Sequence, residues 1–306
     1  MGKIAFVFAG QGAQYSGMGK DIAESSQAAK RVFEMADSIR KDISPLCFFG
    51  TKEQLSVTKN TQPALFLVDL ACAYALKEKG ISPQGAAGFS LGEIPALAFC
   101  GVLSEQDAFR LVIKRGEYMQ ECAEKYGGCM AAVLRLPNER VEALCAEFEN
   151  VFPVNYNCEG QLVVAGLKDE MDAFLQAVAK AGGRSIKLQV NGAFHTKFME
   201  EAAKKLSAEL DRIELNPPVI PLYSNLTAKP YTSDIKGHIT AQLKSPVLWQ
   251  KTIENMIDDG FTTFIEVGAG KVLSGLISKI SSQVSVFNVE DSASLINTVK
   301  LLEETC

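Results

Sequence analysis

The chain has 306 residues, of which 47% are hydrophobic, and its formal net charge at pH 7 is −5. This length can bury a large core as one domain or two, and the acidic balance leaves no basic footprint for a nucleic-acid partner. No apolar stretch reaches the ~18 to 20 residues of a membrane span, since Asp69 interrupts the best candidate at 63–76. The apolar run at the N-terminus is too brief for a secretory signal. We therefore expect a soluble, cytoplasmic protein with no membrane partner.

The eight cysteines are scattered singly along the sequence. No C-x-x-C pair occurs, which argues against a zinc site, and we expect no bound metal. Core thiols in a reducing compartment are expected instead of disulfides, because a large core-forming chain seldom needs such cross-links.

The first elements predict a strand, a loop and two helices. Residues 3–9 alternate β-branched, aromatic and small side chains, which is typical of a buried strand. The loop after it lacks the third glycine of a dinucleotide-binding turn, because Tyr15 stands there. It still places Gln11 at the carboxyl end of a strand, where open α/β sheets bind ligands. Helices are predicted for residues 20–40 and for 61–79, the latter with a proline in its first turn.

Residues 88–92 read G-x-S-x-G, the pattern of a nucleophile elbow. In an elbow, Ser90 lies on a strained turn from strand to helix, with its hydroxyl exposed at the top of the sheet. The alternative is an ordinary glycine-rich turn whose serine caps a helix. A short strand up to Phe89 and a helix after it favour the elbow. Pro95 predicts that this helix kinks or begins irregularly, because proline has no N–H.

The pattern of the chain changes at glycines 127 and 128, after a helix predicted for 104–124. The elements expected next are, in order, a strand at 129–136, a helix at 137–149, strands at 152–157 and 161–166, a helix at 168–181 and a strand at 184–190. This order is that of the ferredoxin-like unit. We therefore predict an α/β fold in which an α/β-hydrolase-like large subdomain, residues 1–127 and 191–306, carries an inserted ferredoxin-like small subdomain, residues 128–190. A ligand cleft is expected between the two.

The last third of the sequence returns to alternating helices and strands. Expected helices are 198–210, 234–243, 246–259 and one that follows the turn at 268–271 and ends at about 281. Expected strands are 219–224 and 261–267. The turn at 268–271 resembles a phosphate-binding loop only superficially. Ile265 and Val272 stand where that loop requires a glycine and a hydroxyl residue.

A serine needs a base to accept its proton, and the chain has only two histidines. His238 lies on a polar helical stretch and is interpreted as a solvated surface residue. His195 follows a glycine-containing loop just before a helix, where a rigid turn can direct it into a cleft. No convincing acid completes a triad, since the candidates Asp107, Asp169 and Asp172 fall on helix faces predicted to be exposed. A backbone carbonyl can orient the imidazole instead.

Six segments, taken in this order, resemble the malonyl-CoA:acyl-carrier-protein transacylases, the acyltransferases that load malonyl units in bacterial fatty acid synthesis. The resemblance is colinear from residue 4 to about residue 280. The segments are Phe8-Ala9-Gly10-Gln11-Gly12, Thr61-Gln62-Pro63-Ala64, Gly88-Phe89-Ser90-Leu91-Gly92-Glu93, Arg115-Gly116 with Met119-Gln120, Ala193-Phe194-His195 and Glu266-Val267-Gly268.

The resemblance implies a set of catalytic roles. Ser90 would attack the malonyl thioester and carry the malonyl group as an ester, and His195 would move the protons. The main-chain carbonyl of Gln242 would orient that histidine. The backbone N–H groups of Gln11 and Leu91 would hold the oxyanion.

The resemblance also implies which residues bind the substrate. Arg115 would bind the malonyl carboxylate in a two-pronged bond, whereas the residues alone favour a surface charge on a helix. Phe194 stands where related enzymes for malonyl carry a bulky residue. Asn157 follows a family pattern too, either at the substrate or as a loop-capping side chain. Phe89 departs from the family, which most often has a histidine before the nucleophile.

The implied reaction is ping-pong transfer from malonyl-CoA to the phosphopantetheine thiol of an acyl-carrier protein, by a monomer with no permanently bound cofactor. Two other functions fit the same scaffold: a discrete acyltransferase serving a polyketide synthase, and a hydrolase of stalled acyl carriers. A further alternative is a non-catalytic carrier-binding protein. The retained set of Ser90, His195, Arg115 and Gln11 disfavours that alternative.

Overall fold

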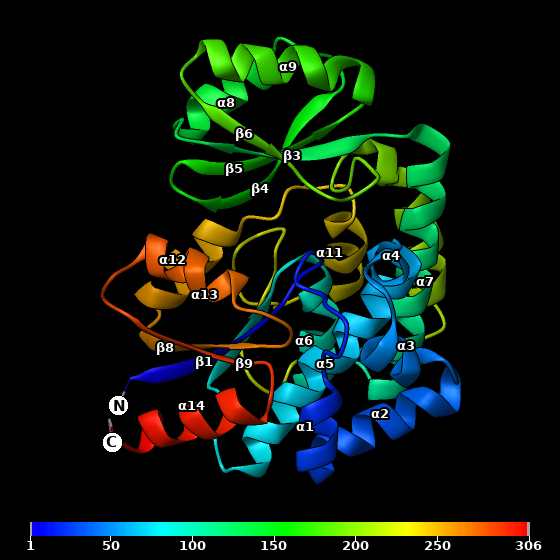
Figure 1. The fold of residues 1–306 in the computed structure, drawn as a ribbon, viewed down its shortest axis with the longest axis vertical. Helices are drawn as coiled ribbons and strands as arrows, with labels where there is room; N and C mark the ends of the chain where they lie inside the picture. Colours follow the sequence, from blue (N-terminus) through cyan, green and yellow to red (C-terminus); the bar gives the residue numbers. More distant parts are fainter. Residues whose placement is uncertain (1, 305–306) are drawn as a thin grey trace.

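Two sheets organise the protein in a computed structural model that describes residues 2–304 (Figure 1). Sheet A is parallel, in the order β7-β2-β1-β8-β9, and sheet B is antiparallel, in the order β4-β5-β3-β6. The predicted α/β fold, with its ferredoxin-like smaller unit, is confirmed. The strands are β1 Lys3–Phe8, β2 Gly85–Gly88, β3 Cys129–Leu134, β4 Val151–Cys158, β5 Gln161–Gly166, β6 Arg184–Lys187, β7 Leu222–Tyr223, β8 Phe261–Val267 and β9 Ser285–Val289.

Helices cover the faces of both sheets. Those of the larger part are α1 Lys20–Ser25, α2 Gln27–Ile39, α3 Ile43–Phe49, α4 Lys52–Ser56, α5 Thr58–Glu78, α6 Glu93–Phe99, α7 Glu105–Tyr126, α10 Glu200–Leu210, α11 Ile235–Gln242, α12 Trp249–Asp258, α13 Val272–Ile280 and α14 Ser292–Glu304. Short 3-10 turns, η1 Ser90–Gly92 and η2 Lys197–Met199, precede α6 and α10. Sheet B carries α8 Asn138–Cys145 and α9 Lys168–Lys180.

The central strand β1 gathers the site loops at one edge of sheet A. Its last residue, Phe8, pairs with Gly88 of β2 on one side and with Val267 of β8 on the other. Because all these strands run parallel, their carboxyl ends meet at one edge of the sheet. The loop with Gln11 and the turn with Ser90 therefore begin side by side, although the sequence separates them widely.

Sheet B has the strand order expected of a ferredoxin-like unit. Figure 1 shows α8 and α9 on the face of sheet B that is turned away from the rest of the chain. The edge strand β4 joins the larger part through a bridge between Asn155 and Val247. The strands and helices of this unit fall within residues 128–190; those exact limits stay a prediction.

Several predicted elements need correction. The helix expected over 20–40 is broken at Ser26, whose hydroxyl accepts a hydrogen bond from the N–H of Ala29 and caps α2. The strand expected at 219–224 is only β7, and the helix at 137–149 and the strand at 184–190 end early, at Cys145 and Lys187. Four elements, α3, α4, β9 and α14, are absent from the predicted set.

The two prolines predicted near helix starts, Pro63 and Pro95, have different surroundings. Helix α5 begins at Thr58, earlier than predicted, so Pro63 lies inside it, and the carbonyl of Lys59 accepts a hydrogen bond from Arg40 instead. Pro95 lies in the first turn of α6, where no helical partner for its nitrogen is needed. The irregular start predicted for this helix is confirmed as the η1 turn.

The predicted burial of the cysteines is confirmed for six of the seven thiols described, and Cys129 is half-buried. Among residues 2–304, no helix is both long enough and apolar enough to cross a bilayer.

The glycines around Ser90 generate a stability prediction. A Cβ on Gly88 would lie 2.0 Å from the carbonyl carbon of Gly92, so Gly88→Ala forces two backbone segments apart. We expect it to lower the free energy of unfolding by about 3 kcal/mol or more. Gly275→Ala is the matched control, because this helical glycine has open space around its Cβ position and should gain about 1 kcal/mol. Urea denaturation measures both, and an equal effect of the two substitutions would contradict the close packing.

Candidate active site

Ser90 lies on a sharp turn between β2 and η1, with φ of +53°. A Cβ on Gly92 would lie 2.2 Å from the carbonyl oxygen of Phe8, so only glycine lets the turn pack onto β1. A positive φ at a non-glycine residue is strained, and a nucleophile elbow has this strained turn. The structure therefore has the geometry of the elbow and not that of a simple capped turn.

Asn225 holds this turn from the neighbouring strand. Its Oδ1 accepts a hydrogen bond of 2.7 Å from the N–H of Ser90, and its Nδ2 donates one of 2.5 Å to the carbonyl of Gly88. Asn225 is not among the predicted site residues. Its position just after β7, next to β2 in a parallel sheet, is the signal from which it can be found.

His195 contacts Ser90 directly. Its Nε2 lies 2.7 Å from Ser90 Oγ, and its Nδ1 lies 2.9 Å from the carbonyl oxygen of Gln242. With Nδ1–H donating to that carbonyl, Nε2 is free to accept the serine proton. Burial, together with the charge of Arg115, lowers the pKa of His195 to about 4, so the imidazole is neutral at physiological pH.

The other acid–base candidates lie elsewhere. Asp169 and Asp172 are exposed and Asp107 is partly exposed on α7, as predicted. His238 is not the solvated residue that we predicted: it is half-buried with its ring against Tyr231, at 5.4 Å between centroids.

Arg115 of α7 is fully buried beside the serine. Its Nη1 donates to Gln62 Oε1 at 2.8 Å, and its Nη2 donates to Gln242 Oε1 at 2.9 Å and to Ser90 Oγ at 3.4 Å. The next residue, Gly116, allows this approach, because a Cβ there would lie 3.1 Å from the Cα of Lys59 on α5. The interpretation of Arg115 as a surface charge is wrong.

The same network contains a buried carboxyl, that of Glu93. Its Oε2 accepts a 2.5 Å hydrogen bond from Gln242 Nε2, which also donates to the carbonyl of Ser90 at 2.7 Å. Gln242 thus connects the arginine to the serine backbone and to Glu93, while Gln62 binds the other guanidinium nitrogen. The family resemblance implies only a carbonyl role for Gln242 and no role for Gln62 or Glu93.

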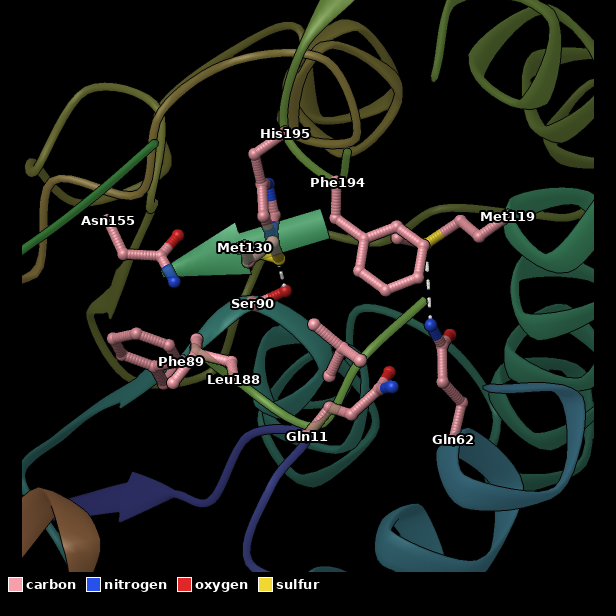
Figure 2. Close-up of a pocket in the computed structure, with 11 residues that line it drawn as sticks. Gln11, Gln62, Phe89, Ser90, Met119, Met130, Asn155, Leu188, Phe194 and His195 are labelled. Carbon is pink, nitrogen blue, oxygen red and sulfur yellow. Dashed lines mark hydrogen bonds between the residues drawn. The ribbon is translucent and has the colours of Figure 1, made fainter. Parts of the chain in front are cut away.

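Two connected hollows lead to Ser90. A cavity of about 60 Å³ contains Ser90 and His195, and Figure 2 shows these two residues between Phe194, Met119 and Gln62 on one side and Asn155 and Phe89 on the other. A groove of about 800 Å³ runs between sheet B and the larger part and shares Gln11, Phe89 and Asn155 with the cavity. The cleft expected between the two parts is present.

The remaining predicted residues surround this cavity. Gln11 lines both hollows. The backbone N–H groups of Gln11 and Leu91 have no hydrogen-bond partner within residues 2–304. Phe194 is buried against the cavity. Asn157 lines only the groove, and its buried Oδ1 is unpartnered. Phe89 packs edge-on against Trp249, at 5.4 Å between ring centroids.

In the part of the chain that the structure describes, no three His, Cys, Asp or Glu side chains are arranged to hold a metal ion. The polar groups of the site are a hydroxyl, an imidazole, a guanidinium and amides, which together suit acyl transfer through a covalent serine ester.

Comparison with known proteins assigns the family. The model of the acyl transferase domain matches residues 5–297. The malonyl CoA-acyl carrier protein transacylase of Bacillus subtilis strain 168 is 40% identical, over 99% of this chain and 98% of that protein. The chain belongs to the malonyl-CoA:acyl-carrier-protein transacylase family.

Solved structures of this transacylase family share the whole architecture. The enzyme from Clostridium perfringens matches with a TM-score of 0.95 and 38% identity, over 99% of this chain and 98% of that one. A malonyl-transacylase solved in complex with a type II polyketide synthase acyl-carrier protein matches with a TM-score of 0.94 and 36% identity, over 98% of this chain and 99% of that one.

The environment of the imidazole generates a titration prediction. We expect His195 to stay neutral until the pH falls to about 4, because burial and Arg115 both oppose its protonation. Nitrogen-15 NMR of the two histidines measures this, with His238→Gln assigning the signals. A midpoint for His195 near its ordinary value of about 6.5 would contradict the buried geometry.

Proposed function

We propose that this protein transfers the malonyl group of malonyl-CoA to the phosphopantetheine thiol of an acyl-carrier protein, through an ester on Ser90, and so supplies fatty acid synthesis in the cytoplasm. The observation that carries the proposal is the meeting of three groups at one buried point. The Ser90 hydroxyl lies between a neutral imidazole at 2.7 Å and a guanidinium at 3.4 Å. The first group activates a nucleophile, and the second suits an acyl group that ends in a carboxylate.

Formation of the ester follows from the hydrogen bonds of His195. Its Nε2 accepts the proton of Ser90 as the serine oxygen attacks the thioester carbonyl. Its Nδ1–H stays on the carbonyl of Gln242, which stabilises the imidazolium that forms. The unpartnered amides of Gln11 and Leu91 would hold the oxyanion, each contributing about 3 kcal/mol. His195 then gives the proton to the departing CoA thiolate.

Transfer to the carrier repeats these steps in reverse order. The phosphopantetheine thiol gives its proton to His195 and attacks the ester, and Ser90 regains its proton as the tetrahedral intermediate collapses. CoA and the carrier both present their thiol on a phosphopantetheine arm. The groove of about 800 Å³ that ends near Ser90 suits such an arm, so one site serves both half-reactions.

Selectivity for malonyl would come from Arg115 and from the volume of the cavity. A buried guanidinium held by two glutamines is pre-oriented for a carboxylate and is left unpaired by an acetyl group. Phe194 narrows a cavity of only about 60 Å³, which favours the unbranched acyl chain.

Support for a carrier as acceptor comes from the family. The relatives named above are acyl-carrier-protein transacylases, and one related structure is a complex with a carrier. A hydrolase of acyl carriers has no need of a carboxylate-binding arginine. The carrier in that complex belongs to a polyketide synthase, so an assay against both kinds of carrier decides the acceptor.

Substitution of the nucleophile tests the covalent step. Ser90→Ala should reduce labelling by radioactive malonyl-CoA to background, because among residues 2–304 no other side-chain hydroxyl hydrogen-bonds His195. Mass spectrometry of the intact protein, followed by addition of holo-carrier, measures both formation and discharge of the ester. Ser233→Ala, at an exposed serine, is the control. Stoichiometric labelling of the Ser90→Ala protein would refute the mechanism.

Substitution of Arg115 tests the carboxylate site. Arg115→Lys keeps the charge but loses the two-pronged bond, so kcat/KM for malonyl-CoA should fall by about 30-fold or more. The value for acetyl-CoA should change much less, because acetyl makes no such bond. Arg110→Ala, at an exposed arginine of the same helix, is the control. An unchanged ratio of malonyl to acetyl transfer would count against this role.

A further inference from the structure

The mechanism above leaves one buried ionisable group unused. Glu93, the first residue of α6, is 1% exposed and lies three residues after the nucleophile. A carboxyl this deeply buried is costly to ionise unless donors or a cation compensate it. Its partners therefore determine what it does.

The donors around Glu93 hold its charged form and link it to the arginine. Oε1 accepts hydrogen bonds from the Tyr231 hydroxyl at 2.6 Å and from the N–H of Asn225 at 3.2 Å. Oε2 accepts from Gln242 Nε2 at 2.5 Å, and Oε1 of the same amide accepts from Arg115 at 2.9 Å. One glutamine side chain thus separates the carboxylate from the buried guanidinium.

Three segments contribute the charged and titratable groups around Glu93. Helix α7 contributes the cation Arg115, and the chain after β7 contributes the phenol of Tyr231. Helix α11 contributes Gln242, whose carbonyl binds His195, and also His238, which lies behind Tyr231. Burial raises the pKa of Glu93 to about 7, against the effect of its donors and of Arg115. Its two charge states are therefore close in free energy near neutral pH.

A malonyl carboxylate changes the charge balance of this site. Before acylation, one cation faces one carboxylate through Gln242. After acylation, two carboxylates share a single buried guanidinium. It is costly to keep two carboxyl groups ionised in one buried site, so the pKa of one of them rises. The malonyl carboxyl contacts the cation, which leaves Glu93 as the group to be neutralised.

We propose that Glu93 is an exchangeable counter-ion of Arg115: it is ionised while the acyl site is empty and takes up a proton when the malonyl carboxylate binds. The proposal rests on the proposed function, because it needs a malonyl ester on Ser90. Glu93 is a positioning residue in this role, since it acts on the substrate through Gln242 and Arg115.

The proton balance makes the uptake measurable. Transfer of the acyl group exchanges no net proton with solvent, because the Ser90 proton leaves on the CoA thiol and His195 returns to its uncharged form. A proton taken from solvent therefore reports a change elsewhere in the site. The Glu93 oxygen facing Tyr231 can receive it, because a phenol oxygen also accepts a hydrogen bond. Oε2 then continues to accept from Gln242, and Arg115 keeps its orientation.

Proton uptake by the unmodified protein is the primary experiment. A pH-indicator dye in weakly buffered solution near pH 7.5 should report uptake of up to about 0.75 proton per malonyl-enzyme formed, because a carboxyl with a pKa of about 7 is about three-quarters ionised there. Acetyl-CoA, which brings no carboxylate, should give acetyl-enzyme without uptake. Mass spectrometry of the same samples separates two failures. Absence of the malonyl ester overturns the proposed function and this inference with it, whereas ester formed without uptake overturns the role of Glu93 alone.

Variants identify the group that takes up the proton. Glu93→Gln should abolish uptake while a malonyl ester still forms. Tyr231→Phe removes a donor to the charged form, so the midpoint of uptake should move to higher pH by about one unit. His238→Gln is the control and should keep the unmodified curve. Uptake that persists in Glu93→Gln, or a midpoint that stays in place in Tyr231→Phe, overturns the assignment.

The same counter-ion sets a pH dependence of selectivity. Above the pKa of Glu93 its carboxylate competes with malonyl for Arg115, so the malonyl-to-acetyl ratio of kcat/KM should fall with rising pH, by about tenfold overall. Protonation of His195 and ionisation of the thiol affect both substrates alike and cancel in the ratio. A ratio that is constant with pH would contradict the competition.

Discussion

A guanidinium buried without a carboxylate partner in direct contact is the constraint around which this site is built. Charge without solvent is costly, and the structure compensates Arg115 with two glutamine oxygens and, one amide further away, with Glu93. One of these groups, Gln242, has a second function. Gln242 also binds the backbone of Ser90 and orients His195, so the substrate-binding cation and the reacting atoms belong to one hydrogen-bonded unit.

The second constraint is the close meeting of strand ends. The turn at Ser90 fits only because Gly88 and Gly92 let backbone approach backbone, and Asn225 then fixes the turn from the adjacent strand. Three neighbouring segments at this end of sheet A thus hold the strained turn at Ser90 in place. The opposite wall belongs to sheet B, which contributes Asn155 from its edge strand. The acyl site therefore lies between the carboxyl ends of the sheet A strands and the edge strand of sheet B.

Sequence patterns predict much of this arrangement, but only where a pattern is local. Strand β8 and the ferredoxin-like order follow from periodicity, and the elbow follows from its glycines. The helix break at Ser26 was missed because a single capping serine resembles an ordinary polar position. The burial of Arg115 was not visible in the sequence, since its partners Gln62 and Gln242 lie on helices far apart in the chain. His238 was misplaced for the same reason, because Tyr231 covers it only after folding.

The pairing of β1 has a consequence for biosynthesis. This strand is translated before the other strands of sheet A, yet it is central in the sheet and needs β2 on one side and β8 on the other. Its second edge stays open until residues 261–267 have been translated. Sheet B, by contrast, is built from one continuous stretch and can complete its pairing earlier. A nascent chain therefore carries a finished small unit beside an apolar strand with an unpaired edge, which is the kind of segment that chaperones shield.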